Sequence, residues 1–152
     1  ATTEIYTLSL HDALPIYRNR VELELSPLCK EYGLGLTTFS PLYQGVLTGK
    51  YNQGIPEGSR ASMDSMAWMR NRITPEKIEI VRKLTDVAID LGITPSQLAI
   101  AWILRRKEVS SVITGATRAE QLDENLGAAE ATEKLTDDIL ESIEQILGNH
   151  PE

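Results

Sequence analysis

The sequence predicts an α/β fold in which short buried strands alternate with helices. Two short runs, Leu34–Phe39 and Ser111–Thr114, are β-prone, and a proline or a glycine follows shortly after each. Around them, apolar residues recur at the three- and four-residue spacing of helices. Because strands that alternate with helices pair in parallel, we expect the two strands to lie side by side with helices packed outside them.

Proline and glycine mark the boundaries of the first elements. Residues 27–32 are expected to end a helix, because Pro27 is tolerated in a first turn and Gly33 is a typical left-handed stop. The first strand follows directly. The segment Gly45–Ser62 is punctuated by glycine and proline and predicts a loop, of a length that is more often functional than idle.

Threonine-proline pairs open two helices in the middle of the chain. Thr74-Pro75 supplies an N-cap and a first-turn proline, and Gly92 ends that helix. Thr94-Pro95-Ser96-Gln97 repeats the signal with the spacing of a capping box. The apolar positions expected to face the core in these two helices are Ile78, Val81, Leu84, Ala88, Leu91, Leu98, Ala101, Trp102 and Leu104.

Two more helices are expected after the second strand. Residues 118–126 form the first, with an inward face made of Ala119, Leu122 and Leu126. Residues 136–148 form the second, which begins at a threonine cap and ends at a glycine. Its apolar stripe consists of Leu140, Ile143 and Leu147.

The number of strands limits the architecture. Two parallel strands cannot form a sheet with both faces covered. A complete (β/α)8 TIM barrel needs roughly 250 residues, and this chain has 152. The predicted fold class is therefore α/β, a partial (β/α)8 TIM barrel that contains the last strands and helices only.

The first 17 residues do not fit this pattern. They show no clean period, and they are too polar and lack the basic start of a signal peptide. They resemble a translated sequencing adapter. We therefore expect a non-native leader over residues 1–17 and the C-terminal part of a barrel, with its cofactor-binding segments, over residues 18–152.

Composition excludes several functional classes. The net charge of −7 and the pI of about 4.9 argue against a nucleic-acid surface. The acids gather after Glu120, as on the solvated outer faces of two helices. No apolar run approaches the roughly 20 residues of a membrane span. The single cysteine, Cys29, cannot form an internal disulfide and is expected to be a small core thiol, which suits a reducing, cytoplasmic compartment.

The segment after the first strand carries groups that suit a phosphate-rich cofactor. Phe39 is a flat aromatic that could stack on a ring, or it could be plain core packing. Ser40 and Gln44 add a hydroxyl and an amide, and Leu42 adds backbone groups. Two loop cations could fold over a pyrophosphate and a 2′-phosphate, or they could be solvated surface charges; these are Lys50 and Arg60.

The segment after the second strand suits the same kind of ligand. Gly115 lets a ligand approach the backbone, and the helix that begins near Thr117 directs unpaired N–H groups toward an anion. Arg118 adds a positive charge. An ordinary capped helix is the alternative. Three polar side chains share one helix face and could bond a ribose, a phosphate edge or an adenine; they are Gln121, Glu124 and Asn125.

Two longer motifs resemble one known family. SPLYQGVLTGKY (residues 40–51) is similar to the strand-end signature of the aldo-keto reductases, and GATRAEQLDENLGA (residues 115–128) is similar to their late cofactor helix. GIPEGSRAS and the closing ILGN resemble the branch that contains the beta subunits of voltage-gated potassium channels and their bacterial relatives. The chain is thus identified as the C-terminal half of an aldo-keto reductase.

The resemblance implies an NADPH-linked carbonyl reductase, or alternatively a cofactor-sensing regulatory subunit. It implies that Phe39 stacks on the nicotinamide. The implied pyrophosphate contacts are Ser40, Pro41, Leu42, Gln44 and Lys50. The implied contacts to the 2′-phosphate are Arg60, Thr117 and Gln121, and those to the adenine are Glu124 and Asn125. Weaker members of the site are Tyr51, Gly115 and Arg118.

The resemblance also implies that these residues do not include the catalytic groups of the family. The family's catalytic Asp, Tyr, Lys and His lie on early strands, so no residue here is assigned a catalytic role, and none is assigned to a metal. We expect the chain by itself to be inactive. The implied partner is a small carbonyl substrate, without nucleic acid or membrane insertion. The resemblance leaves two oligomeric states for the intact protein, a monomer or a homo-oligomer.

Overall fold

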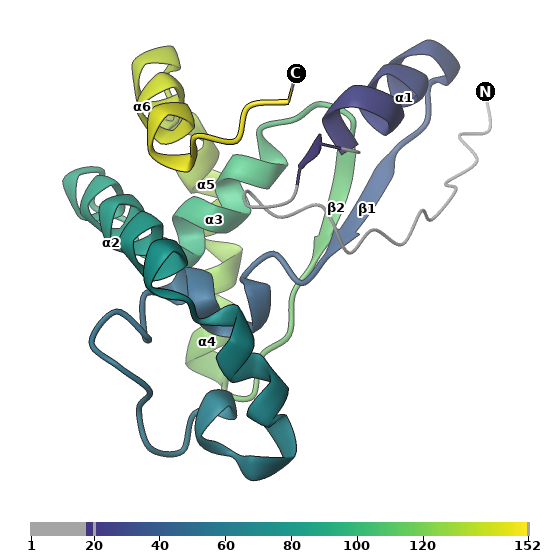
Figure 1. Ribbon diagram of the computed structural model, residues 1–152. Coiled ribbons are helices and arrows are strands. Elements are labelled where there is room, and N and C mark those ends of the chain that lie inside the picture. Colours follow the sequence, from purple (N-terminus) through teal and green to yellow (C-terminus); the bar gives the residue numbers. More distant parts are fainter. Residues whose placement is uncertain (1–17, 20, 152) are drawn as a thin grey trace.

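The computed structural model describes residues 18, 19 and 21–151. The expected leader therefore lies outside the described residues. Two strands, β1 (Leu36–Phe39) and β2 (Val109–Ile113), form a parallel sheet. Helix α3 (Pro95–Leu104) lies between this sheet and the pair formed by α2 (Pro75–Asp90) and α6 (Asp137–Leu147) (Figure 1).

The strand register brings the two predicted site segments to one edge. Leu36 pairs with Val109 and Phe39 with Ile113, with one irregularity between Leu36 and Thr37. Parallel strands end at the same side of a sheet. The segments that follow Phe39 and Ile113 therefore leave the sheet together, as the alternation of strands and helices predicted.

Before and after β1 the chain folds into short helical turns. A π-helical turn, η1 (Val21–Leu25), precedes α1 (Ser26–Tyr32), and Gly33 ends α1 in the left-handed conformation, as predicted. Three 3-10 segments follow β1: η2 (Tyr43–Thr48), η3 (Arg60–Ser62) and η4 (Asp64–Arg72). The prediction of a continuous loop from Gly45 to Ser62 is wrong at both of its ends. Single turns of this kind carry no periodic signal in the sequence.

The predicted caps of the middle helices are confirmed. The Thr74 hydroxyl accepts from the N–H of Lys77 at the start of α2. At the start of α3, the Gln97 N–H donates to Thr94 Oγ1 at 3.1 Å, and the Thr94 N–H donates to Gln97 Oε1 at 3.0 Å. This reciprocal pair is the capping box that the spacing indicated. It fixes the beginning of α3, against which the site segments pack.

The chain after β2 forms α4 (Ala119–Leu126), α5 (Ala128–Ala131), the 3-10 turn η5 (Thr132–Lys134) and α6. The prediction for α6 is confirmed, because Ile143 and Leu147 are buried. The predicted inward face of α4 is wrong: Leu122 is 48% exposed and Leu126 is 65% exposed. Periodicity identifies an apolar stripe but not the element that covers it. Among the described elements, none covers the stripe of α4.

Helix α3 forms the centre of the core. Six consecutive residues of α3, from Leu98 to Ile103, are buried. Cys29 is also buried, and burial, with the carboxylate of Glu108, raises the pKa of its thiol, so it is the core thiol that was expected. Over the described residues no single helix is long and apolar enough to cross a membrane; α2 and α3, bent by 90°, pass that test together by length and composition only.

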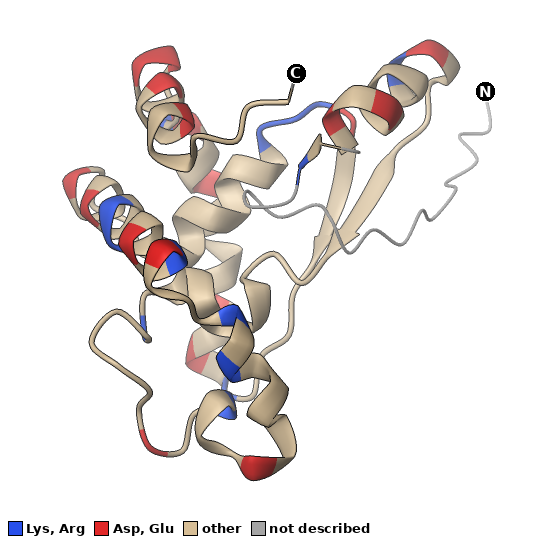
Figure 2. Cartoon of the chain, viewed as in Figure 1, with Lys and Arg blue, Asp and Glu red and all other residues tan. Residues whose placement is uncertain are grey.

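A charge network joins the beginning of the described chain to its end. Arg18, which is 2% exposed, pairs with Glu144 of α6 and faces the ring of Trp102 at 5.5 Å. Arg106 pairs with Glu22 at 2.6 Å and with Glu108 at 3.1 Å. Figure 2 shows the basic segment between α3 and β2 that contains Arg106. These pairs lie at the end of the sheet opposite to the strand-end segments.

Candidate cofactor-binding site

The segment after β1 is a strained turn. Ser40, Tyr43 and Gln44 have positive φ angles of 57°, 48° and 52°, and Gly45 follows at 94°. Each non-glycine residue in this left-handed region costs roughly 1–2 kcal/mol. Two backbone hydrogen bonds hold the chain in this shape, from the Tyr43 N–H to Ser40 O at 3.0 Å and from the Gly45 N–H to Leu42 O at 2.8 Å. Strain of this kind gathers at functional sites.

Lys50 lies over this turn. A Cβ placed on Gly45 would be 2.5 Å from Lys50 Nζ, so the ammonium group lies directly against the backbone of Gly45. The same ammonium faces the ring of the buried Tyr51 at 5.1 Å. The Thr48 hydroxyl donates to Gly45 O at 2.8 Å and closes the turn. The structure thus brings together Ser40, Gln44 and Lys50, which the sequence predicted as one site.

Two cations that sequence reasoning missed contact the same turn. Arg72, at the end of η4, donates from Nη1 to Gln44 Oε1 at 3.1 Å. Its guanidinium faces the rings of Tyr43 at 5.3 Å and Trp68 at 5.1 Å. Lys77 in the first turn of α2 donates from Nζ to Tyr43 Oη at 3.1 Å. The spacing of four between Trp68 and Arg72 was the only sequence signal for this cluster.

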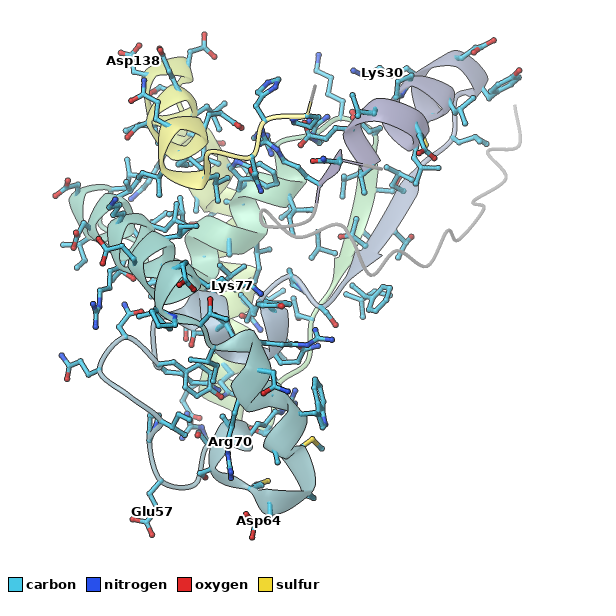
Figure 3. The ribbon with its side chains drawn as sticks, in the orientation of Figure 1. Lys30, Glu57, Asp64, Arg70, Lys77 and Asp138 are labelled. Atoms are coloured by element: carbon cyan, nitrogen blue, oxygen red, sulfur yellow. The ribbon has the colours of Figure 1, made fainter. Side chains whose placement is uncertain are left out.

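The predicted phosphate cation Arg60 is exposed in η3. Its segment is tied down by Arg70, which donates from Nε to Ala61 O at 2.9 Å and lies 3.5 Å from Asp64 (Figure 3). No hydrogen bond or ion pair between described residues joins Arg60 to Thr117 or Gln121. The grouping of these three side chains around one phosphate therefore stays a prediction.

The segment after β2 is exposed from Gly115 to Arg118. Arg118 is the N-cap of α4 and supplies no side-chain cap. Gln121 Oε1 accepts from the N–H of Thr117 at 2.9 Å and from its hydroxyl at 3.1 Å. Because the amide oxygen is engaged, the amide NH2 of Gln121 is the end that remains for a ligand.

Helix α3 supports both segments. Gln97 Nε2 donates to Glu124 O at 3.1 Å, and a Cβ on Gly127 would lie 2.5 Å from that nitrogen. A Cβ on Gly49, just after η2, would lie 3.7 Å from Cγ of Pro95. Both site segments thus lie against the first turn of α3, and a hydrogen bond joins the second of them to it. Asn125 is buried at 8% exposure, whereas Gln121 and Glu124 are half-buried.

The donor chemistry fits a dinucleotide. Charge-assisted donors bind phosphate oxygens, and the exposed cations Lys50, Arg60 and Arg118 lie in the two segments. Within the described part of the chain, the buried Tyr51 hydroxyl has no hydrogen-bond partner. Phe39 ends β1 half-buried, opposite Ile113, which is 53% exposed. An aromatic face, a cationic turn and a helix N-terminus thus stand at one sheet edge.

Comparison with known proteins identifies relatives of this chain. The aldo/keto reductase family model matches residues 5–147. A protein of Schizosaccharomyces pombe named as a voltage-gated potassium channel subunit beta is 46% identical over 137 residues, which cover 88% of this chain and 40% of that protein. A protein of the same kind of name from Arabidopsis thaliana is 46% identical over 136 residues, covering 88% and 42%. The chain spans about two fifths of the length of these curated relatives.

Proposed function

Because this chain belongs to the aldo/keto reductase family, we propose that its two strand-end segments bind NADPH in a protein that reduces aldehydes or ketones to alcohols. The observation that carries the proposal is the strained turn after β1, with the Lys50 ammonium folded over Gly45. The strand register places this turn at the same edge as the N-terminus of α4. A strained, cationic turn beside a helix N-terminus is suited to a pyrophosphate.

Each segment has its own part in the proposed binding. The turn and Lys50 hold the pyrophosphate, and Phe39 stacks on the nicotinamide. Arg60, with the hydroxyl of Thr117 and the free amide end of Gln121, reads the 2′-phosphate. The accepting groups of Glu124 suit the adenine amino group. Asn125 is the second proposed adenine contact, and its side chain is largely buried.

The described residues bind and orient; they do not complete the chemistry. NADPH, when bound, supplies a hydride to the carbonyl carbon. The exclusion of water above the nicotinamide falls to Phe39 and its neighbours at the sheet edge. The group that protonates the carbonyl oxygen is not assigned to any residue of this chain. The proposed substrate is a small carbonyl compound, and the proposed compartment is the cytoplasm.

Cofactor binding is tested with the chain itself and with a hybrid, in which the upstream part of the S. pombe relative precedes Arg18. Titration of NADPH is followed by its fluorescence. Lys50→Met should weaken binding roughly ten- to a hundredfold, because a charge-assisted contact is worth about 1.5–3 kcal/mol. Lys83→Met on α2, an exposed lysine paired with Glu79, is the charge-matched control. Equal effects of the two variants would contradict a site at the turn.

Turnover separates binding from catalysis. The hybrid with NADPH and a small aldehyde should consume the cofactor, while the 152-residue chain should not, because hydride transfer needs a proton donor. Turnover by the chain alone, above a control without protein, would show that one of its own residues supplies the proton.

The second candidate is a regulatory subunit that senses the state of a bound cofactor. The observation in its favour is that both relatives reported above are named as potassium channel beta subunits. The same hybrid discriminates. Tight NADPH binding without turnover of any aldehyde or ketone would favour the regulatory subunit, and turnover would favour the enzyme.

A further inference from the structure

We propose that Arg72 is a positioning residue for the cofactor turn: it holds Tyr43 and Gln44, at the start of η2, in their left-handed conformation and orients the amide of Gln44. This inference rests on the proposed function, because it assigns a device that prepares the same site for NADPH. Arg72 belongs to neither strand-end segment. It comes from the end of the 3-10 segment η4, and its side chain reaches Gln44 and Tyr43 of the turn.

The turn needs support from outside. Tyr43 and Gln44 are adjacent, and both have positive φ angles, of 48° and 52°. Neither is a glycine, so without support both residues would leave the left-handed region of backbone conformation. Such a conformation persists only where the surroundings over-determine it. Arg72 contacts both residues, through the hydrogen bond to Gln44 Oε1 and through the Tyr43 ring.

The hydrogen bond also decides which end of the Gln44 amide faces a ligand. A guanidinium carries donors only, so Gln44 must turn its oxygen toward Arg72. The amide NH2 is then the end left for an acceptor. A phosphate accepts hydrogen bonds, so this orientation suits it, whereas the flipped amide would present an oxygen to an anion. Arg72 thereby prepares a donor.

Two cations contact Tyr43. Its ring is 3% exposed, and Arg72 and Lys77 face it at 5.3 and 5.2 Å. Lys77 also donates to its hydroxyl. The guanidinium of Arg72 reaches Trp68 as well, which is 48% exposed. One arginine therefore links η4, the Tyr43 ring and the Gln44 amide. A lysine there could make the hydrogen bond or the ring contact but lacks the planar fork that does both.

The test uses the 152-residue chain with Arg72→Met, which keeps an apolar stem beside the rings and removes the donors. Arg72→Lys is the conservative rescue, and Lys83→Met is the charge control. The first readout needs no cofactor: amide hydrogen exchange of the Gly45 and Leu47 N–H groups, which both donate to Leu42 O. The second is the affinity for NADPH and for NADH. Circular dichroism confirms that each variant is folded.

We expect Arg72→Met to speed amide exchange at Gly45 and Leu47 at least about tenfold. The affinities for NADPH and for NADH should fall equally, by about five- to tenfold. Arg72→Lys should recover part of both, and Lys83→Met should change neither. If amide exchange were unchanged and only the affinity for NADPH fell, the inference would be overturned, because Arg72 would then contact a phosphate itself. Unchanged exchange and affinity would overturn it too.

The two proposals can fail separately. If the unsubstituted chain and the hybrid bind no NADPH, the proposed function is wrong. The exchange measurement then still decides whether Arg72 holds the turn: faster exchange in Arg72→Met supports that role, and unchanged exchange refutes it.

Discussion

Among the three predicted contacts to the 2′-phosphate, which are Arg60, Thr117 and Gln121, Arg60 is the cation. NADPH and NADH differ near it only by the 2′-phosphate, and a guanidinium suits a phosphate by its fixed charge and forked donors. Arg60→Ala in the hybrid should therefore lower the affinity for NADPH roughly ten- to a hundredfold and barely change the affinity for NADH. Titration of both cofactors measures this. Equal losses would show that Arg60 holds η3, and no loss would leave it a solvated surface cation.

Gly45 tests the strained turn directly. Its φ angle is 94°, and a Cβ there would be 2.5 Å from the Lys50 ammonium. Gly45→Ala should lower the free energy of unfolding by about 1–3 kcal/mol, since an alanine is strained at this φ angle, whereas the flexible end of Lys50 can move aside. Gly115→Ala is the matched control, because a Cβ at Gly115 meets no described atom within 4 Å. Denaturant titration of both variants compares them; similar stabilities would contradict the geometry.

At the residue scale, local chemistry was predictable and long-range pairing was not. Ser40, Gln44 and Lys50 stand in one continuous motif, so the sequence indicated them together. Arg72 and Lys77 reach the turn across separations of 28 and 34 residues. Nothing in a single sequence marks which cation folds back onto which aromatic. The positive φ angles at Tyr43 and Gln44 were equally hidden, because neither residue type requires them.

At the scale of elements, helix starts were predicted best. The caps at Thr74, Thr94 and Thr136 each accept the expected backbone bond. Those bonds are local, so the sequence contains all of their partners. The orientation of α4, in contrast, does not depend on neighbouring residues alone. Its buried side chain is Asn125, and its leucines face away, because burial depends on neighbours that come from elsewhere in the chain.

The exposed face of α4 leads to a prediction of its own. Leu122 and Leu126 are 48% and 65% exposed, so replacing both by glutamine removes little buried area. The free energy of unfolding should change by less than about 0.5 kcal/mol per site, while binding of an apolar dye falls. Ile143→Ala, at a site 2% exposed, should instead cost about 2–5 kcal/mol. Comparable losses in the two variants would mean that α4 buries its leucines in solution.

At the scale of the whole molecule, the charge network is the link between the two ends of the described chain. Arg18 and Glu144 are separated by 126 residues and are joined by a hydrogen bond of 2.6 Å. Arg105 lies beside them, and burial, together with the charge of Arg106, lowers its pKa to about 10, so it stays charged at neutral pH. Periodicity and motifs gave no sign of this network, since its partners come from distant parts of the chain.

The network makes stability depend on acid. Burial alone would raise the pKa of Glu144, but the hydrogen bond and charge of Arg18 outweigh it, so that pKa lies below its ordinary value. A lowered pKa stabilises the fold above the unfolded value of about 4.3. This contribution is lost as the pH falls through the still lower value of the folded state. The free energy of unfolding should therefore decrease below about pH 4.5.

A variant isolates the share of Glu144 in this acid dependence. Glu144→Gln should lose about 1.5–3 kcal/mol at pH 7, because it leaves the guanidinium of Arg18, which is 2% exposed, with a neutral acceptor. The difference from the unsubstituted chain should shrink as the pH falls below the unfolded value of about 4.3, because the unfolded carboxyl then takes up a proton before the folded one does. Glu141→Gln, on the exposed side of the same helix, is the matched control and should change stability by less than about 0.5 kcal/mol. Denaturant titrations at several pH values measure all three proteins. A difference that stayed constant down to pH 3 would mean that the carboxylate charge of Glu144 contributes nothing, and that its effect on stability comes from packing.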